Sequence, residues 1–534
     1  MRIKSQILVK LPFMITIVVI VGLSIQTSVL HLVNSSYIAT ALSIHSIAAD
    51  HGSTTGGNTV TITGDFGASI GPQITTSVQH SLALDSNGQI WAWGGNYSGQ
   101  LGDGTNTNSS TPITISTSGT LLDITPTRIT AGTGRSFVLD HDGKIHSWGW
   151  NIAGELGNGT WDDSNVPAVV DMTGVLYGRN ILEVAAGWHH SLALDSEGNI
   201  FAWGANGRGQ LGSGTLGGGS NVPVAVDMTG MLADRNIIQV AAGNNHSLAL
   251  DSEGNIFAWG IGINGQLGDG AATDSGVPVV VDTSGVLAGR KIIQISAGGS
   301  HSLALDSEGS IFAWGGNWDG QLGNGTNTTS NVPVIVDTSG VLAGRNIVQV
   351  VAATSGGNHS LALDDKGNIF AWGHNVNGQL GDGMVNAWGW PFPYSNTPVA
   401  VDMTGVLAGS SVTQIAASQS HSLALDSKGN VFSWGGNWSG QLGNGTTTGS
   451  NIPLFVMNLG VPTNPIQSVT LGGLYCTNIQ IINPNTITCI VPAHPAGTVD
   501  VVVNTLHGSA TLYQGYTYID IPDVPNTGHL RKED

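Results

Sequence analysis

The chain has 534 residues, of which 78 are glycine and 10% are charged. That length can hold two or more hydrophobic cores, and the glycine-rich, weakly charged composition favours short strands and tight turns over helices. Lys and Arg number 16 against 35 Asp and Glu, a formal net charge of −19, so the chain lacks the basic surface that neutralises phosphates and we expect no nucleic-acid partner.

Residues 1–43 have the pattern of a targeting segment. Three basic residues, Arg2, Lys4 and Lys10, accompany an apolar run from Leu11 to Ile25. This pattern is typical of a secretory signal peptide, and an uncleaved membrane anchor is the alternative. The sequence therefore predicts an extracellular or cell-surface location, with N-terminal membrane anchoring if the segment is retained.

Residues 44–68 begin a domain that the neighbouring sequence does not complete. The stretch HGSTTGGNTVTITGDF, residues 51–66, is a Gly/Thr-rich turn followed by an alternating strand with Val60 and Ile62. No adjacent segment offers a strand to pair with it. The rest of its sheet is expected to come from elsewhere in the chain.

Copies of one unit fill residues 74–458 and decide the predicted fold. A run such as HSLALDSEGNIFAWG returns at intervals of 55 to 62 residues, and the seven runs start at His80, Arg135, His190, His246, His301, His359 and His421. Two alternating segments flank a glycine turn in each run, which predicts a hairpin. A GQLGDGT-type turn, a strand after a proline and a strand ending in small residues complete a four-stranded unit. Repeated radially, such units form a β-propeller with the small residues innermost.

The repeated HSLAL, the following WG and the GQLGDGT turn resemble the regulator of chromosome condensation repeat family, whose fold is a seven-bladed propeller. The second unit departs from the pattern, with Arg135 in place of the histidine and GELGNG in place of GQLG. The family's eukaryotic founder is a guanine-nucleotide exchange factor, while many relatives are binding scaffolds. The resemblance therefore implies the fold and leaves the function open.

Residues 459–519 resemble the missing part of the domain that begins at residue 44. Their alternating strands, which include Ile479, Ile487 and Val501, lack a first hairpin. Taken together, residues 44–66 and 466–519 resemble an IPT/TIG domain, an immunoglobulin-like β-sandwich. The expected fold class is all-β, a seven-bladed β-propeller inserted into a small immunoglobulin-like β-sandwich. The alternative is a stray N-terminal strand beside a truncated sandwich.

Cys476 and Cys489 are the only cysteines. On neighbouring predicted strands of an exported chain they predict a disulfide, worth roughly 3 kcal/mol, and two buried thiols are the alternative. Neither cysteine belongs to a Cys-x-x-Cys or Cys/His cluster, so no metal site and no cofactor are predicted.

Several residue types recur once per blade. The repeated histidines and the tryptophans of the WG pairs are interpreted as blade-packing and core residues, since equivalent places around a propeller lie too far apart to share one metal ion. In four blades an arginine follows an aspartate by eight residues, which predicts a repeated salt bridge or a turn-bracing hydrogen bond, with a basic ring for an anionic ligand as the alternative. These pairs are Asp171 with Arg179, Asp227 with Arg235, Asp282 with Arg290 and Asp337 with Arg345.

The sixth unit contains an aromatic insertion, GDGMVNAWGWPFPYSNTP, residues 381–398. It predicts a binding site formed by Trp388, Trp390, Phe392 and Tyr394, because aromatic side chains on a proline-stiffened loop are typical binding anchors. The alternative is a loop folded onto its own blade. Other aromatic residues near the turns are candidates for the same face, namely Tyr97, Trp150, Trp188, Trp318 and Trp438.

Residues 520–534 form a tail in which VPNTG, residues 524–528, resembles the sortase LPxTG pattern. A sorting signal also needs an apolar segment and a basic tail after this pattern, and only six residues follow it here. Wall anchoring is therefore not predicted.

The sequence thus predicts a monomeric exported or cell-surface scaffold that binds a protein or glycan partner through propeller loops. No nucleophile motif, P-loop or paired-carboxylate pattern is found, so no enzymatic activity is expected. The alternative from another functional class is a guanine-nucleotide exchange factor for a small GTPase.

Overall fold

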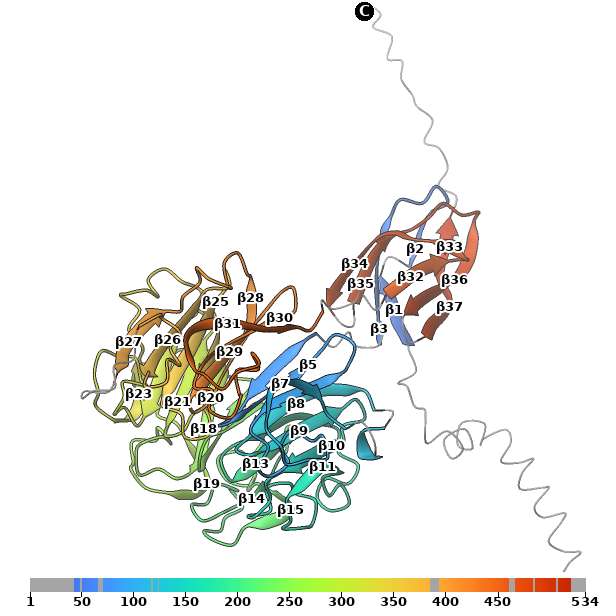
Figure 1. The fold of residues 1–534 in the computed structure, drawn as a ribbon. Helices are drawn as coiled ribbons and strands as arrows, with labels where there is room; N and C mark the ends of the chain where they lie inside the picture. The colour runs from blue at the N-terminus through green and yellow to red at the C-terminus, as the bar shows by residue number, and fades with distance from the viewer. Residues whose placement is uncertain are drawn as a thin grey trace, which may run out of the picture. The chain divides into compact units, whose positions relative to one another are not determined.

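The computed structural model describes residues 43–48, 50–65, 71–116, 119–122, 124–384, 393–460, 466–483, 486–505 and 508–519. Its contacts divide the chain into two compact units, residues 70–462 and residues 1–69 with 463–534. The first unit is a propeller and the second is a sandwich (Figure 1). The only helical turn in the described residues is the 3-10 turn η1 (Gly119–Leu121).

The propeller has seven four-stranded antiparallel blades, and each blade takes its strands consecutively from the chain. Blade 1 contains β4 (Gln73–Thr76), β5 (His80–Leu84), β6 (Ile90–Gly94) and β7 (Ser109–Thr114), and blade 2 contains β8 (Pro126–Gly132), β9 (Arg135–Asp140), β10 (Ile145–Gly149) and β11 (Ser164–Val169). Blade 3 contains β12 (Ile181–Ala186), β13 (His190–Asp195), β14 (Ile200–Gly204) and β15 (Ser220–Ala225), and blade 4 contains β16 (Ile237–Ala242), β17 (His246–Asp251), β18 (Ile256–Gly260) and β19 (Ser275–Val280). Blade 5 contains β20 (Ile292–Ala297), β21 (His301–Asp306), β22 (Ile311–Gly315) and β23 (Ser330–Ile335), and blade 6 contains β24 (Ile347–Ala352), β25 (His359–Asp364), β26 (Ile369–His374) and β27 (Tyr394–Ala400). Blade 7 contains β28 (Val412–Ala417), β29 (His421–Asp426), β30 (Asn430–Gly435) and β31 (Ser450–Asn458).

Glutamine side chains connect the innermost strands of neighbouring blades. The Gln239 amide donates to the Ile295 carbonyl at 3.1 Å and accepts from the Ile295 N–H at 2.9 Å, so it imitates one residue of a β-ladder. The same pair of hydrogen bonds joins Gln414 of the last blade to Ile74 of the first, and this closes the ring. The equivalent residues in blades 1, 5 and 6 are Gln73, Gln294 and Gln349.

The repeated HSLAL and WG motifs form the interfaces between blades. The His246 Nε2 lies 3.1 Å from the Ser302 Oγ of the next blade, and that hydroxyl donates to the Gln266 carbonyl at 3.0 Å. The same carbonyl accepts from Trp314 Nε1 at 3.0 Å. Since the serine hydroxyl uses its proton on the carbonyl, it accepts from the histidine, and the ring hydrogen lies on Nε2. The interpretation of the repeated histidines and tryptophans as packing residues thus agrees with the structure.

Burial keeps these histidines neutral. All six are fully buried, and desolvation lowers the pKa of His80, His246, His301 and His421 from 6.5 to about 3. It lowers the pKa of His190 and His359 in the same direction. The unfolded chain would therefore bind protons at these positions at a pH where the propeller does not.

We predict that acid unfolds the propeller cooperatively. Between pH 6.5 and about 3, each of His80, His246, His301 and His421 gains a proton only on unfolding. The free energy of unfolding therefore falls by about 1.4 kcal/mol per pH unit for each one. This contribution is complete above pH 6.5 and is lost as the pH falls. Urea titrations at a series of pH values measure the slope. His301→Gln should reduce the slope by about one proton. A stability independent of pH would contradict the prediction.

The sandwich contains two sheets built from both ends of the chain, shown in Figure 1 as blue strands among red ones. The first sheet has the order β1 (Ser43–Ala48), β3 (Thr59–Asp65), β35 (Thr486–Ile490), β34 (Thr477–Asn483). The second has the order β2 (His51–Ser53), β37 (Gly508–Ile519), β36 (Gly497–Thr505), β32 (Ile466–Leu471), β33 (Leu474–Tyr475).

Strand β3 pairs antiparallel with β35, with Val60 opposite Cys489 and Ile62 opposite Ile487. Strand β2 pairs parallel with β37. Both strand pairs span the whole propeller in the sequence, and they bury Val60 and Ile62 in the same cluster as Val501. The predicted fold class, a propeller inserted into an immunoglobulin-like sandwich, is confirmed. The exact domain boundaries stay predictions.

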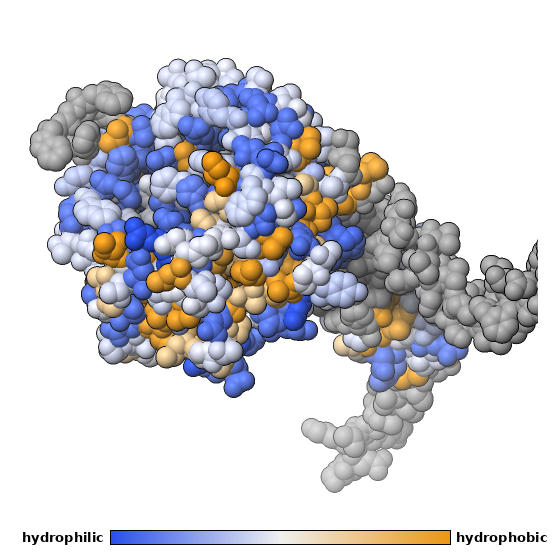
Figure 2. All heavy atoms as spheres, turned by 90° about the horizontal axis from the view of Figure 1, so that it is seen from below, coloured by the Kyte–Doolittle hydropathy of each residue, from blue (hydrophilic) through white to orange (hydrophobic). Residues whose placement is uncertain are grey.

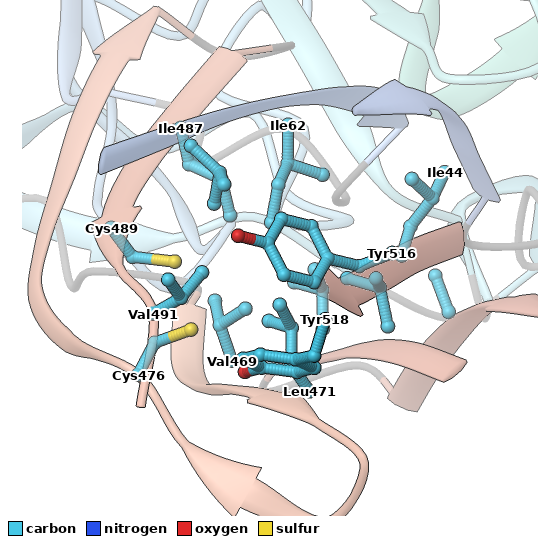
Figure 3. Packing of buried hydrophobic residues seen from close by; sticks show 14 residues of the cluster. Ile44, Ile62, Val469, Leu471, Cys476, Ile487, Cys489, Val491, Tyr516 and Tyr518 are labelled. Carbon is cyan, nitrogen blue, oxygen red and sulfur yellow. The ribbon is translucent and has the colours of Figure 1, made fainter. Parts of the chain in front are cut away.

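The two cysteines lie in the core of this sandwich as free, buried thiols. Figure 3 shows both sulfur atoms directed into the apolar cluster near Val491 and Tyr518. The predicted disulfide is therefore corrected to the alternative of two buried thiols, which pack as small apolar groups. A hydrogen bond with Cys489, together with burial, raises the pKa of the Cys476 thiol.

Neither thiol should react with a thiol reagent in the folded protein, because both sulfur atoms are buried and the pKa of the Cys476 thiol is raised. Two thiols per chain should react once the protein is denatured without reductant. Ellman titration before and after denaturation measures both numbers. Finding no reactive thiol after denaturation would restore the disulfide.

Candidate functional site

The antiparallel blades give the propeller two different ends. The connections from first to second strand and from third to fourth strand lie at one end, which we name the loop end. The hairpins between second and third strands, with the connections to the next blade, lie at the hairpin end. Each end carries its own set of side chains.

The repeated arginines brace the hairpin end. Arg179 donates to Asp195 at 3.2 Å and to Glu197 at 2.5 Å, both from the hairpin of the blade that it precedes. The expected partner Asp171 instead accepts hydrogen bonds from Thr173, which lower the pKa of its carboxyl. A salt bridge was thus predicted with the wrong aspartate. Matching pairs are Arg235 with Asp251 and Glu253, Arg290 with Asp306 and Glu308, and Arg345 with Asp364.

Cationic side chains are distributed unequally between the two ends. The loop-end connections contain a single cationic residue, Arg208, which forms an ion pair with Asp274 at 3.2 Å. The hairpin end carries the lysines and the other exposed arginines of the connections. The loop-end carboxylates are Asp103, Glu155, Asp162, Asp163, Asp269, Asp274, Asp319 and Asp382. The hairpin end also carries carboxylates, and several of them pair with its arginines. The loop-end carboxylates share a single cationic residue of their connections, which makes this end attractive to a cationic partner.

The loop end also exposes large apolar side chains at one repeated position. Near the start of each third-to-fourth connection, five blades place a side chain that is at least half exposed, namely Tyr97, Ile152, Ile263, Trp318 and Trp438. On the face drawn in Figure 2, apolar residues occur as separate patches among hydrophilic ones. Exposed aromatic residues that recur in this way are typical of protein-binding surfaces.

The predicted aromatic site is described only in part. Trp388, Trp390 and Phe392 lie outside the described residues. Tyr394 starts β27, pairs with His374 of β26 and is 44% exposed. A binding role for these four residues stays a prediction.

Two of the other candidate aromatic residues, Trp150 and Trp188, pack on the ring of His189 instead of extending into solvent. Trp188 stacks on His189 with 5.6 Å between ring centroids, and Trp150 meets the same ring edge-on at 5.7 Å. Tyr97, Trp318 and Trp438 are exposed. The candidate aromatic residues therefore divide into a packed cluster on blades 2 and 3 and exposed single residues.

Blade 6 extends its first-to-second connection, residues 353–358, across the propeller axis. The Gly356 N–H donates to Asn244 Oδ1 of blade 4 at 2.7 Å, and Ser355 Oγ lies 3.4 Å from Ser77 Oγ of blade 1. These blades are not neighbours of blade 6, so the connection covers the loop end of the central channel. The sequence signal was the 58-residue interval from His301 to His359.

A pocket of about 300 Å³ lies beside this connection, between blades 6 and 7. Its lining combines amide, hydroxyl and imidazole groups with one aromatic wall, and consists of Gly356, Asn358, His374, Asn377, Gln419, Ser420 and Trp438. Sequence reasoning missed most of these residues because they occupy variable positions. Their positions within the repeat could have identified them. Asn358 and Ser420 directly precede the repeated histidine, and His374 directly follows the WG pair.

His374 lines the pocket as a neutral imidazole. Its Nδ1 lies 2.8 Å from Gln379 Nε2, an amide nitrogen that can only donate, so the ring hydrogen is on Nε2. Burial lowers the pKa of His374, and the charge of Asp319 opposes this effect. No group of three or more His, Cys, Asp or Glu side chains in the described part of the chain is arranged to hold a metal ion.

Blade 2 departs from the repeat at Arg135 and Glu155, which form a pair of buried, opposite charges. Arg135 is fully buried and donates to the carbonyls of Trp188 at 2.7 Å and His190 at 2.7 Å, which replaces the usual His–Ser contact. Burial lowers its pKa to about 10, and the charge of Glu155 opposes this. Burial alone would raise the pKa of Glu155, but the hydrogen bond with His189 and the charge of Arg135 lower it. The two sequence departures therefore compensate each other.

We predict that Glu155→Gln destabilises the propeller by roughly 1–3 kcal/mol, because it leaves a buried guanidinium without its opposing charge. The double variant Arg135→His with Glu155→Gln should recover most of this loss, since it recreates the combination found in the other blades. Urea denaturation of the two single variants and the double variant measures the coupling. Purely additive losses would contradict the compensation.

Known families match most of the chain. The RCC1-like domain matches residues 117–477, and regulator of chromosome condensation (RCC1) repeats match residues 73–100 and 87–139. The IPT/TIG domain matches residues 442–518. The fold and these matches define a propeller of the RCC1 class combined with an IPT/TIG sandwich. The chain belongs to the regulator of chromosome condensation (RCC1) repeat family.

Relatives within this family have diverse names. The chain is 31% identical to the ultraviolet-B receptor UVR8 of Arabidopsis thaliana, over 73% of this chain and 82% of the receptor. It is 31% identical to the mitochondrial RCC1 domain-containing protein RUG3 of the same plant, over 58% of this chain and 66% of RUG3. Identity to the human E3 ubiquitin-protein ligase HERC2 is 29% over 71% of this chain, but over only 7% of the ligase. The crystal structure of Prp20p from Saccharomyces cerevisiae has a TM-score of 0.58 at 22% identity, covering 78% of this chain and 93% of Prp20p, and shows the shared fold.

These relatives correct the predicted function and location. They are named as a light receptor, a mitochondrial protein and a ubiquitin ligase, so the expected exported or cell-surface scaffold and its extracellular location are wrong. The exchange-factor alternative agrees better with the family. Glycan binding, a signal peptide and membrane anchoring receive no support. Within the described residues, which begin at 43, no helix is long and apolar enough to span a bilayer.

Proposed function

We propose that this protein is a regulator that binds a protein partner through the loop end of its propeller. The observation that carries the proposal is the composition of that end, where exposed Tyr97, Trp318 and Trp438 accompany an excess of carboxylates over a single cationic residue. Aromatic residues supply the buried contact area of an interface, and the charge selects a partner surface of opposite sign.

The activity that we propose for this regulator is guanine-nucleotide exchange on a small GTPase. Exchange requires a surface that stabilises one conformation of the GTPase, and it needs no nucleophile or metal from the exchange factor. Support comes from membership of the RCC1 repeat family and from Prp20p, which is described as binding Gsp1p and histones. The ligase activity of HERC2 belongs to a much longer protein, and no catalytic step is proposed for this chain.

The test is release of a fluorescent guanine nucleotide from a panel of purified small GTPases. The full chain should accelerate release from at least one of them, and Trp318→Ala should weaken that effect about thirtyfold, the usual loss for an aromatic hot spot of about 2 kcal/mol. Lys428→Ala, in a hairpin at the opposite end, is the control and should have no effect.

A stable complex with a GTPase, without faster nucleotide release, would support the proposed binding surface and contradict the exchange activity. An equal loss in Lys428→Ala and Trp318→Ala would contradict the choice of the loop end. Absence of any complex with the panel would contradict a GTPase as the partner.

A further inference from the structure

The pocket between blades 6 and 7 contains a buried hydroxyl that has no hydrogen-bond partner. Ser420 is 1% exposed, lines the pocket, and its Oγ makes no hydrogen bond within the described structure. A buried hydroxyl left in this state costs free energy that a polar ligand atom would recover. The neighbouring Ser418 Oγ, in contrast, lies 3.0 Å from His421 Nδ1. Ser300 of blade 5 has an equally unpartnered hydroxyl, but only Ser420 lines the pocket, where a polar ligand group can satisfy it.

The surrounding charges favour a cation over an anion. The Asn358 side-chain nitrogen donates to Asp319 Oδ2 at 2.9 Å, which leaves the side-chain oxygen Oδ1 to accept from a ligand. His374 is neutral, so it provides no positive charge for an anion. The loop-end connections of blades 5 to 7 contain Asp319 and Asp382 and no lysine or arginine. Incoming positive charge would thus meet acceptors and negative potential.

Trp438 supplies a wall suited to a planar cation. It lines the pocket and is 50% exposed, so its ring has a free surface for a ligand. A guanidinium or ammonium group over a tryptophan ring gains a cation–π contact, and a planar guanidinium also stacks on it. Acceptor oxygens on one side and an aromatic ring on the other make a complete setting for such a group.

We propose that this pocket holds an arginine or lysine side chain of the protein partner. This inference rests on the proposed function, because it assigns the chemistry by which the loop end recognises its partner. Ser420 Oγ and Asn358 Oδ1 accept hydrogen bonds from the cation. Asp319 supplies the negative charge behind Asn358, and Trp438 packs over the side chain of the ligand.

The experiment uses the full chain and labelled Gly/Ser-rich peptides whose two central residues are both arginine, lysine, citrulline or glutamate. Fluorescence anisotropy measures binding. Arginine and lysine peptides should bind about tenfold or more tightly than the citrulline peptide, which has a similar shape without the charge, and the glutamate peptide should not bind. Equal binding of arginine and citrulline peptides, or preference for glutamate, would overturn the proposal.

Variants locate the binding. Ser420→Ala, Asp319→Asn and Trp438→Ala should each weaken the arginine peptide several-fold. The matched control is Ser300→Ala, since Ser300 occupies the equivalent place in blade 5, and its buried Oγ likewise lacks a partner, but it does not line the pocket. Unchanged binding in all three pocket variants, with unchanged melting temperatures, would place the peptide elsewhere and overturn the proposal. Should one variant unfold, the other two still decide.

The outcome separates this inference from the proposed exchange activity. Binding of the arginine peptide with these variant effects, but without nucleotide release from any GTPase, would support the pocket and remove the exchange function. Nucleotide release that is unaffected by Ser420→Ala and Asp319→Asn, in a protein that does not bind the arginine peptide, would remove the pocket and keep the exchange function.

Discussion

The backbone carbonyl in the middle of each GQLG turn is the junction on which the propeller depends. In every blade it accepts one hydrogen bond from a serine hydroxyl and one from a tryptophan Nε1 of the next blade, as Gln210 does from Ser247 and Trp259 at 2.9 Å each. The last junction, Gln441 with Ser81 and Trp93, closes the ring. Each contact is buried, so losing one member leaves an unsatisfied polar group in an apolar interface.

This junction explains why the repeat has its particular motif. Histidine, serine, tryptophan and the GQLG turn are separate in the sequence of one blade, yet they meet across the interface between two blades. Glycine at the turn is required by close packing, since a Cβ at Gly268 would lie 2.7 Å from the Trp314 Nε1 of the following blade, and its φ is +67°. A change at one motif position therefore needs a matching change elsewhere, as the Arg135 and Glu155 pair of blade 2 illustrates.

The same arrangement leaves specific positions free to carry function. Residues that precede the repeated histidine, follow the WG pair or begin the third-to-fourth connection lie at the loop end and take no part in the junction. Asn358, His374 and Trp438 are of this kind, and they line one pocket. The arginines at the opposite end are used in ion pairs with the hairpin carboxylates. Function at the loop end can thus vary without disturbing the ring.

The sequence by itself determined the propeller, because seven copies of one spaced motif can bury their apolar faces only by packing on one another. It also indicated the split sandwich, because residues 51–66 and 466–519 each lack the strands that the other contains. The partner of Arg179, the free state of Cys476 and Cys489, and the pocket were decided only by the tertiary structure. Arg179 chooses Asp195 over Asp171 because the turn brings together residues that sequence spacing does not relate. The pocket draws Asn358, His374 and Ser420 from two blades, and which variable positions become neighbours depends on the twist and the closure of the ring.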